Sequence, residues 1–227
     1  MRNKISLCFK VAIALSSTLG IILSFLRSDA DGYSHWSKRL LYFTAQSNIW
    51  IGVLSLIMLL YALIYKSKED TRVKNILYVL KYIFTVSITV TGLIFCAVLA
   101  PGAANDNYNA WTLPSLLTHV IVPALSIADL FVDGYRIRLK RIHVLYTTLP
   151  LFIYMIFSGV LYFLNVDFGR GDSFPYFFLN YGSPAGVFGF SSEMPYIVGS
   201  FYWIILILFI VFGFASLYRK LYNKNQQ

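Results

Sequence analysis

Long runs of apolar residues alternate with short polar segments along this chain of 227 residues. A helix needs about 20 predominantly apolar residues to cross a bilayer. The runs that reach this length cover residues 5–26, 40–65, 76–100, 113–132, 143–164 and 197–218. Together they occupy most of the chain. The pattern therefore predicts an all-α, polytopic membrane protein in which six transmembrane helices form one domain over residues 1–227.

The composition supports this prediction. Hydrophobic residues make up 58% of the chain and charged residues only 13%, whereas soluble domains carry about 25% charged residues. The first apolar run follows Arg2 and Lys4, as in a signal peptide, but the segment after it is a poor cleavage site. We therefore expect this run to be retained as a span.

The net charge of +9 is distributed by topology and does not form a nucleic-acid-binding patch. Basic residues gather around the start of the first span, between the second and third, between the fourth and fifth, and after the sixth: Arg2, Lys4, Lys10, Lys66, Lys68, Arg72, Lys74, Arg136, Arg138, Lys140, Arg141, Arg219, Lys220 and Lys224. The positive-inside rule then places both termini in the cytoplasm. We expect these loops to contact anionic lipid headgroups. The pattern fits a bacterial cytoplasmic membrane.

A polar cluster opens the second span. Thr44, Ser47 and Asn48 are spaced i, i+3 and i+4, so they share one helical face. Small polar side chains often join helices within membranes by hydrogen bonds. Ser47 and Asn48 therefore have a structural interpretation beside a functional one.

His119 lies inside the fourth span. An ionisable side chain in a membrane is costly, so by default it marks a functional site, although a lone histidine can also be a packing residue. Ser115 precedes it by one helical turn. Pro123 cannot donate a hydrogen bond to the His119 carbonyl, which predicts a helix kink beside the imidazole.

Thr44 and His119 are predicted to lie at similar depths in the outer leaflet. At about 1.5 Å per residue, they lie about 6 Å and about 9 Å below the outer ends of their spans. If the two spans are neighbours, the hydroxyl and the imidazole would meet as a nucleophile and its general base. Ser47, Asn48 and Ser115 would then stabilise an oxyanion or bind substrate.

The segment between the fifth and sixth spans, residues 165–196, is long for a connection in a compact bundle. It is rich in aromatic residues, and its prolines and glycines exclude a long helix. We expect it either to form an aromatic belt at the membrane surface or to fold back over the outer mouth of the bundle.

Three short motifs stand out: Tyr42-Phe43-Thr44-x-x-Ser47-Asn48, Leu117-Thr118-His119-x-x-x-Pro123 and Phe174-Pro175-Tyr176-Phe177-Phe178-Leu179. In these motifs, and in its six spans, the chain resembles the androgen-induced-gene family and its bacterial relatives. Eukaryotic members of that family are intramembrane hydrolases of fatty acid esters of hydroxy fatty acids, and they use a threonine and a histidine. The resemblance implies these two roles for Thr44 and His119.

The leading hypothesis is therefore an intramembrane hydrolase whose lipid ester substrate enters from the bilayer. Thr44 would be the nucleophile and His119 the base, with no cofactor and no metal ion. One rival hypothesis is a small-solute or ion transporter or channel, with Asp129 and Asp133 also lining a polar path. The other is a structural membrane protein without turnover. No nucleic-acid partner is expected.

Overall fold

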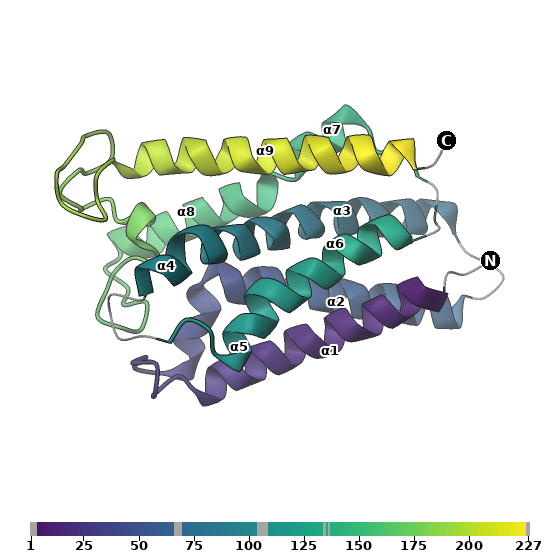
Figure 1. Cartoon of the computed structure of the whole chain (residues 1–227), viewed down its shortest axis with the longest axis horizontal. Helices are drawn as coiled ribbons and strands as arrows, with labels where there is room; N and C mark the ends of the chain where they lie inside the picture. The colour runs from purple at the N-terminus through teal and green to yellow at the C-terminus, as the bar shows by residue number, and fades with distance from the viewer. Residues whose placement is uncertain (1–3, 66–69, 104–108, 134, 136, 226–227) are drawn as a thin grey trace.

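The computed structural model of this protein is a bundle of helices (Figure 1). It describes residues 4–65, 70–103, 109–133, 135 and 137–225. In chain order the helices are α1 (Lys4–Leu26), η1 (Trp36–Leu41), α2 (Phe43–Ile64), α3 (Thr71–Ile94), η2 (Phe95–Leu99), α4 (Ala100–Ala103), α5 (Leu113–Leu116), η3 (Leu117–Ile121), α6 (Val122–Val132), α7 (Arg141–Tyr146), α8 (Leu149–Phe163), η4 (Phe177–Leu179) and α9 (Ser200–Lys224). The segments η1 and η4 are 3-10 helices, and η2 and η3 are π-helical turns.

Six helical segments are long and apolar enough to cross a membrane: Lys4–Leu26, Phe43–Ile64, Thr71–Leu99, Leu113–Val132, Arg141–Phe163 and Ser200–Lys224. They confirm the prediction of an all-α polytopic membrane protein with six spans. The start of α1 and the end of α9 lie at the same end of the bundle (Figure 1). An even number of spans produces this arrangement.

Polar caps and turns move two helix starts away from the predicted spans. The helix α2 begins later than the predicted span 40–65, because Tyr42 is extended (ψ 141°) and separates it from η1. The helix α3 begins earlier than the predicted span 76–100, because the Asp70 side chain accepts a hydrogen bond from Arg72 N–H at 2.7 Å. Capping residues are polar and lie outside the apolar run, so hydrophobicity alone does not locate them.

The last two spans also differ from their predicted limits. The predicted span 143–164 is divided into α7 and α8 by a turn at Thr147 and Thr148. The helix α9 begins and ends later than the predicted span 197–218. Its last turns continue because the aromatic ring of Tyr222 is buried against the protein.

The helix α3 occupies the centre of the bundle. It packs against α2, α6, α8 and α9, while α1 packs against α2 and α6 (Figure 1). Gly52 of α2 faces Ser17 of α1 with no room for a side chain between them. Membrane helices often approach closely at such small residues, because association depends on packing and not on excluding water.

Part of the long connection folds back onto the end of the bundle that lies opposite the termini. Phe178 and Leu179 are buried and belong to the main hydrophobic core. The ring of Phe177 packs against Trp203 of α9, with 5.4 Å between ring centroids. Of the two arrangements expected for residues 165–196, this part of the segment therefore adopts the fold-back.

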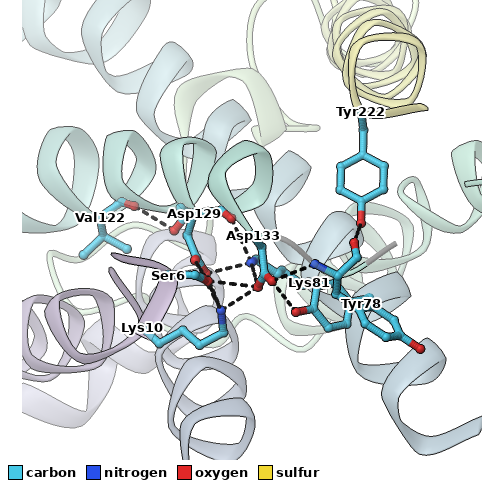
Figure 2. A network of polar contacts seen from close by, with 10 residues as sticks. Ser6, Lys10, Tyr78, Lys81, Val122, Asp129, Asp133 and Tyr222 are labelled. Carbon is cyan, nitrogen blue, oxygen red and sulfur yellow. Dashed lines mark hydrogen bonds and ion pairs between the residues drawn. The ribbon is translucent and has the colours of Figure 1, made fainter. Parts of the chain in front are cut away.

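Four charged side chains meet between α1, α3 and α6, and we call Lys10, Lys81, Asp129 and Asp133 the charge cluster (Figure 2). Lys10 Nζ lies 3.2 Å from Asp129 Oδ2 and 2.7 Å from Asp133 Oδ2. Lys81 Nζ lies 2.8 Å from each of the same two oxygens. All four side chains are at most 8% exposed. The cluster balances two positive and two negative charges within the protein.

Hydroxyl groups complete the hydrogen bonding of this cluster. Ser6 Oγ donates to Asp129 Oδ1 at 2.5 Å, and Tyr78 OH donates to Asp133 Oδ1 at 2.5 Å. Buried charges are tolerated when they are paired and fully hydrogen-bonded. The charge cluster therefore fixes α1, α3 and α6 relative to one another.

The charge cluster corrects one sequence prediction. Lys10 is grouped by its position with the basic residues that contact headgroups, but it lies within α1 and is 4% exposed. Its ammonium group neutralises carboxylates and does not face lipid headgroups. The predicted headgroup contacts of Arg2, Lys66, Lys68 and Arg136 lie outside the described residues.

Candidate active site

Thr44 lies in the first turn of α2, at the end of the bundle opposite the termini. Its Oγ1 is 3.2 Å from His119 Nε2, which is a hydrogen-bond distance. The predicted approach of Thr44 and His119 is therefore confirmed, while a catalytic role stays a prediction. The first turn of a helix also carries a partial positive charge, which favours an alkoxide at this position.

The backbone and a neighbouring hydroxyl fix the tautomer of His119. Its Nδ1 lies 3.0 Å from Ser115 O and 3.1 Å from Thr118 Oγ1. A carbonyl can only accept, and the Thr118 hydroxyl already donates to Pro114 O at 2.8 Å. We therefore assign the hydrogen to Nδ1. Nε2 is then the unprotonated nitrogen that faces Thr44 Oγ1, as a general base requires.

Two π-helical turns shape the surroundings of the imidazole. His119 lies within η3, where Val122 N–H bonds to Leu117 O, five residues earlier. The kink predicted from Pro123 therefore takes the form of a widened turn just before the proline. Phe95 opens the second π-helical turn, η2, and its ring stacks on the imidazole with centroids 3.9 Å apart. Such turns are frequent at functional sites.

Gly92 of α3 packs directly against the His119 backbone. A Cβ atom at Gly92 would lie 2.6 Å from His119 O and 3.1 Å from Pro123 Cγ. No real side chain tolerates the shorter contact, so Gly92 sets how closely α3 approaches the π-helical turn.

Replacing Gly92 by alanine is expected to lower the free energy of unfolding by about 1–3 kcal/mol, because the added methyl group overpacks the interface with His119. Thermal unfolding of the purified protein in detergent measures this loss. Gly213→Ala in α9 is the matched control, since nothing lies within 4 Å of a Cβ there. Equal losses in the two variants would contradict the close contact.

Ser47 and Asn48, next to Thr44, hold the helices of the site together by hydrogen bonds. Asn48 Nδ2 donates to Thr44 O at 2.9 Å and to Thr118 O at 3.0 Å, so both amide hydrogens are engaged. Ser47 Oγ lies 3.2 Å from Thr44 O and 3.0 Å from Thr91 Oγ1. These bonds join α2 to η3 and α3. Of the two interpretations of Ser47 and Asn48, their contacts match the structural one.

Ser115 was predicted to stabilise an oxyanion or bind substrate, but its side chain makes a different contact. Its hydroxyl accepts a hydrogen bond from Thr112 Oγ1 at 3.2 Å. Its contribution to the site is the backbone carbonyl that orients His119. Side-chain identity could not reveal this, because any residue at this position supplies a carbonyl.

Tyr176 is the site residue to which the sequence assigned no role. Its hydroxyl accepts from Thr44 N–H at 3.4 Å and lies 3.5 Å from Thr44 Oγ1. Burial raises the pKa of Tyr176 to about 12, so the phenol is protonated at neutral pH. The only sequence signal was its place in the aromatic motif 174–179.

An apolar cavity opens beside Thr44. The space between its lining atoms, including the open mouth, is about 600 Å³. Its walls come from α2, α3, η2, α8, α9 and the aromatic motif 174–179, and the lining side chains are mostly aliphatic and aromatic. Thr44, Thr91, Tyr154 and Tyr176 are the lining residues with hydroxyl groups. His119 does not line the cavity, but its Nε2 lies within hydrogen-bond distance of Thr44, which does.

The described part of the chain contains no group of three or more histidine, cysteine, aspartate or glutamate side chains that could hold a metal ion. Comparisons with protein-family models, curated proteins and solved structures gave no match for this chain. The arrangement of Thr44, His119, Tyr176 and the cavity therefore carries the functional argument.

Proposed function

We propose that this protein is an intramembrane hydrolase of lipid esters, with Thr44 as nucleophile and His119 as general base. The observation that carries the proposal is the 3.2 Å separation of Thr44 Oγ1 from the unprotonated Nε2 of an imidazole whose Nδ1 is held by Ser115 O. A threonine hydroxyl is a weak nucleophile until a base removes its proton. The resemblance to the androgen-induced-gene family implies the same two roles.

The reaction proceeds in two halves. Thr44 Oγ1 attacks the ester carbonyl carbon while His119 Nε2 takes the hydroxyl proton. The tetrahedral intermediate then collapses, the alcohol oxygen leaves, and it takes the proton from His119. Water then attacks the acyl carbon of the acyl-threonine while His119 Nε2 takes a proton from the water. The bond to Thr44 Oγ1 breaks, Thr44 Oγ1 takes that proton from His119, and the fatty acid is released.

The cavity supports a substrate with a long hydrocarbon chain. Its apolar walls match an acyl chain, and Thr44 lies at its edge, where a carbonyl carbon could reach the hydroxyl. The substrate enters laterally from the bilayer. With the basic ends of the helices in the cytoplasm and on anionic headgroups, the site faces the outer leaflet of a bacterial cytoplasmic membrane.

The test is hydrolysis of a fluorogenic long-chain ester by the purified protein in lipid nanodiscs. Replacing His119 by alanine is expected to lower kcat on the order of 10²-fold or more, because the general base is lost. His143→Ala is the matched control, since His143 lies on α7 near the end of the bundle that holds the termini. Equal turnover by the two histidine variants would refute the assignment of the base.

A further inference from the structure

The proposed reaction places negative charge on the carbonyl oxygen, and that oxygen needs a hydrogen-bond donor. The side chains that the sequence suggests for this task are Ser47, Asn48 and Ser115, of which Ser115 does not line the cavity beside Thr44. Both amide hydrogens of Asn48 are held by Thr44 O and Thr118 O. The Ser47 hydroxyl is engaged with Thr44 O and Thr91 Oγ1. The donor must therefore come from another part of the site.

The ester approaches Thr44 through the cavity, so a donor has to face that space. Of the lining hydroxyls other than Thr44, Tyr154 OH donates to Leu41 O at 3.1 Å. Thr91 Oγ1 donates to Ser87 O at 3.2 Å. These two hydrogens point at backbone carbonyls.

Tyr176 has the required position. Its oxygen accepts from Thr44 N–H at 3.4 Å, so its own hydrogen can point toward the neighbourhood of Thr44 Oγ1, which is 3.5 Å away. Tyr176 lines the cavity, whereas His119 is not among the lining residues. Thr44 Oγ1 therefore has one neighbour, Tyr176, that faces the space from which the ester approaches, and a second, His119, that can serve as base.

We propose that Tyr176 is a catalytic residue that donates its phenolic hydrogen to the oxyanion formed when Thr44 attacks an acyl ester. This inference rests on the proposed hydrolase function. In the step concerned, the bond from Thr44 Oγ1 to the carbonyl carbon forms and the carbonyl π pair moves to oxygen. His119 Nε2 takes the threonine proton. Tyr176 keeps its proton and shares it with the oxyanion until the alcohol leaves.

The phenol of Tyr176 is a neutral hydrogen-bond donor at an apolar cavity. A pKa of about 12 keeps the phenol protonated at neutral pH, so it donates without adding charge to the cavity. Hydrogen bonds to a developing charge are stronger in an environment without water than in solution. The packing of Tyr176 also limits its motion, since its ring stacks on Phe178 with 5.1 Å between centroids.

The first test is Tyr176→Phe, which removes one oxygen atom and keeps the ring. We expect kcat for the long-chain ester to fall about 10²-fold, as for loss of one oxyanion donor, with KM nearly unchanged. Tyr181→Phe is the matched control, because Tyr181 belongs to the same segment but does not line the cavity. Tyr176→Phe with unchanged kcat, or an equal loss in Tyr181→Phe, overturns the proposal.

A second measurement separates donation from packing. A difluorotyrosine placed at position 176 keeps the hydroxyl and lowers its pKa. We expect this protein to retain turnover and to lose it with rising pH at a lower pH than the unchanged protein, because only the protonated phenol donates. An unmoved alkaline limit overturns the proposal even if Tyr176→Phe fails to fold.

The Thr44, His119 and Tyr176 variants together distinguish failure of the hydrolase function from failure of the Tyr176 role. If Thr44→Ala retains full hydrolysis, the assignment of Thr44 as nucleophile is refuted, and the role of Tyr176 with it. If Thr44→Ala and His119→Ala are both impaired while Tyr176→Phe turns over normally, only the role of Tyr176 is lost.

Discussion

Replacing Thr44 by alanine is expected to abolish both ester hydrolysis and covalent labelling by a fluorophosphonate probe. The variant lacks the oxygen that would attack either compound, and no other hydroxyl lies within hydrogen-bond distance of His119 Nε2 in the described residues. Turnover in nanodiscs and labelling on a gel measure the two effects. A loss of more than about 10³-fold in kcat is the expected size, because nucleophilic catalysis is removed entirely.

Thr44→Ser is the matched control for this experiment. It keeps a primary hydroxyl at the same position, so we expect it to retain part of the turnover and all of the labelling. Full hydrolysis by Thr44→Ala would refute the nucleophile. Labelling that survives in Thr44→Ala would show that the probe reacts with another residue.

Replacing Asp129 by asparagine is expected to destabilise the protein by about 3–5 kcal/mol, the cost of breaking a buried ion pair by removing one partner. Asp129 is 1% exposed, and its side chain faces both Lys10 and Lys81. The amide leaves the two ammonium groups with one carboxylate. Thermal or denaturant unfolding in detergent measures the loss, with the exposed Glu193→Gln as control.

A double variant tests the physical reason for that loss. Lys81→Met together with Asp129→Asn removes one positive and one negative charge and leaves Lys10 paired with Asp133 at 2.7 Å. We expect it to be more stable than either single variant, because charge balance is restored. Additive losses would show that packing, and not charge, explains the effect of Asp129→Asn.

The fold followed from the sequence because apolar runs long enough to span a bilayer have few other stable solutions. The fourth span, residues 113–132, has the same limits in the structure. The limits of two other spans shifted because a polar cap, Asp70, or an extended residue, Tyr42, sets where the helix begins. Those signals are local and do not depend on hydrophobicity.

The pairing of Thr44 with His119 could be predicted from their similar depths in the membrane, since helical rise converts sequence position into distance along the bundle. The role of Tyr176 could not be predicted, because the segment that carries it has no periodicity from which its path could be derived. The bracing role of Asn48 was likewise hidden. Its two acceptors are backbone carbonyls, one of them at Thr118 on another helix, and a sequence does not show where a carbonyl points.

The burial of Lys10 and Lys81 in the charge cluster was not predicted from the sequence, for another reason. A lysine near the end of an apolar run is usually explained by snorkelling to the interface. Lys10 and Lys81 fit that explanation in sequence, but both are buried and bonded to Asp129 and Asp133. Only the neighbouring helices distinguish the two cases.

The order of the charge cluster along the chain has a consequence for how the protein is made. Synthesis runs from the N-terminus, so Lys10 and Lys81 are produced before Asp129 and Asp133. Until the two carboxylates join them, the ammonium groups have to stay at the headgroups, because an unpaired charge inside the bilayer is costly. The packing of α1 against α6, and the ion pairs that join both helices to Lys81 of α3, therefore wait for the fourth span. Assembly of the amino-terminal half is in this way coupled to the insertion of the segment that also carries His119.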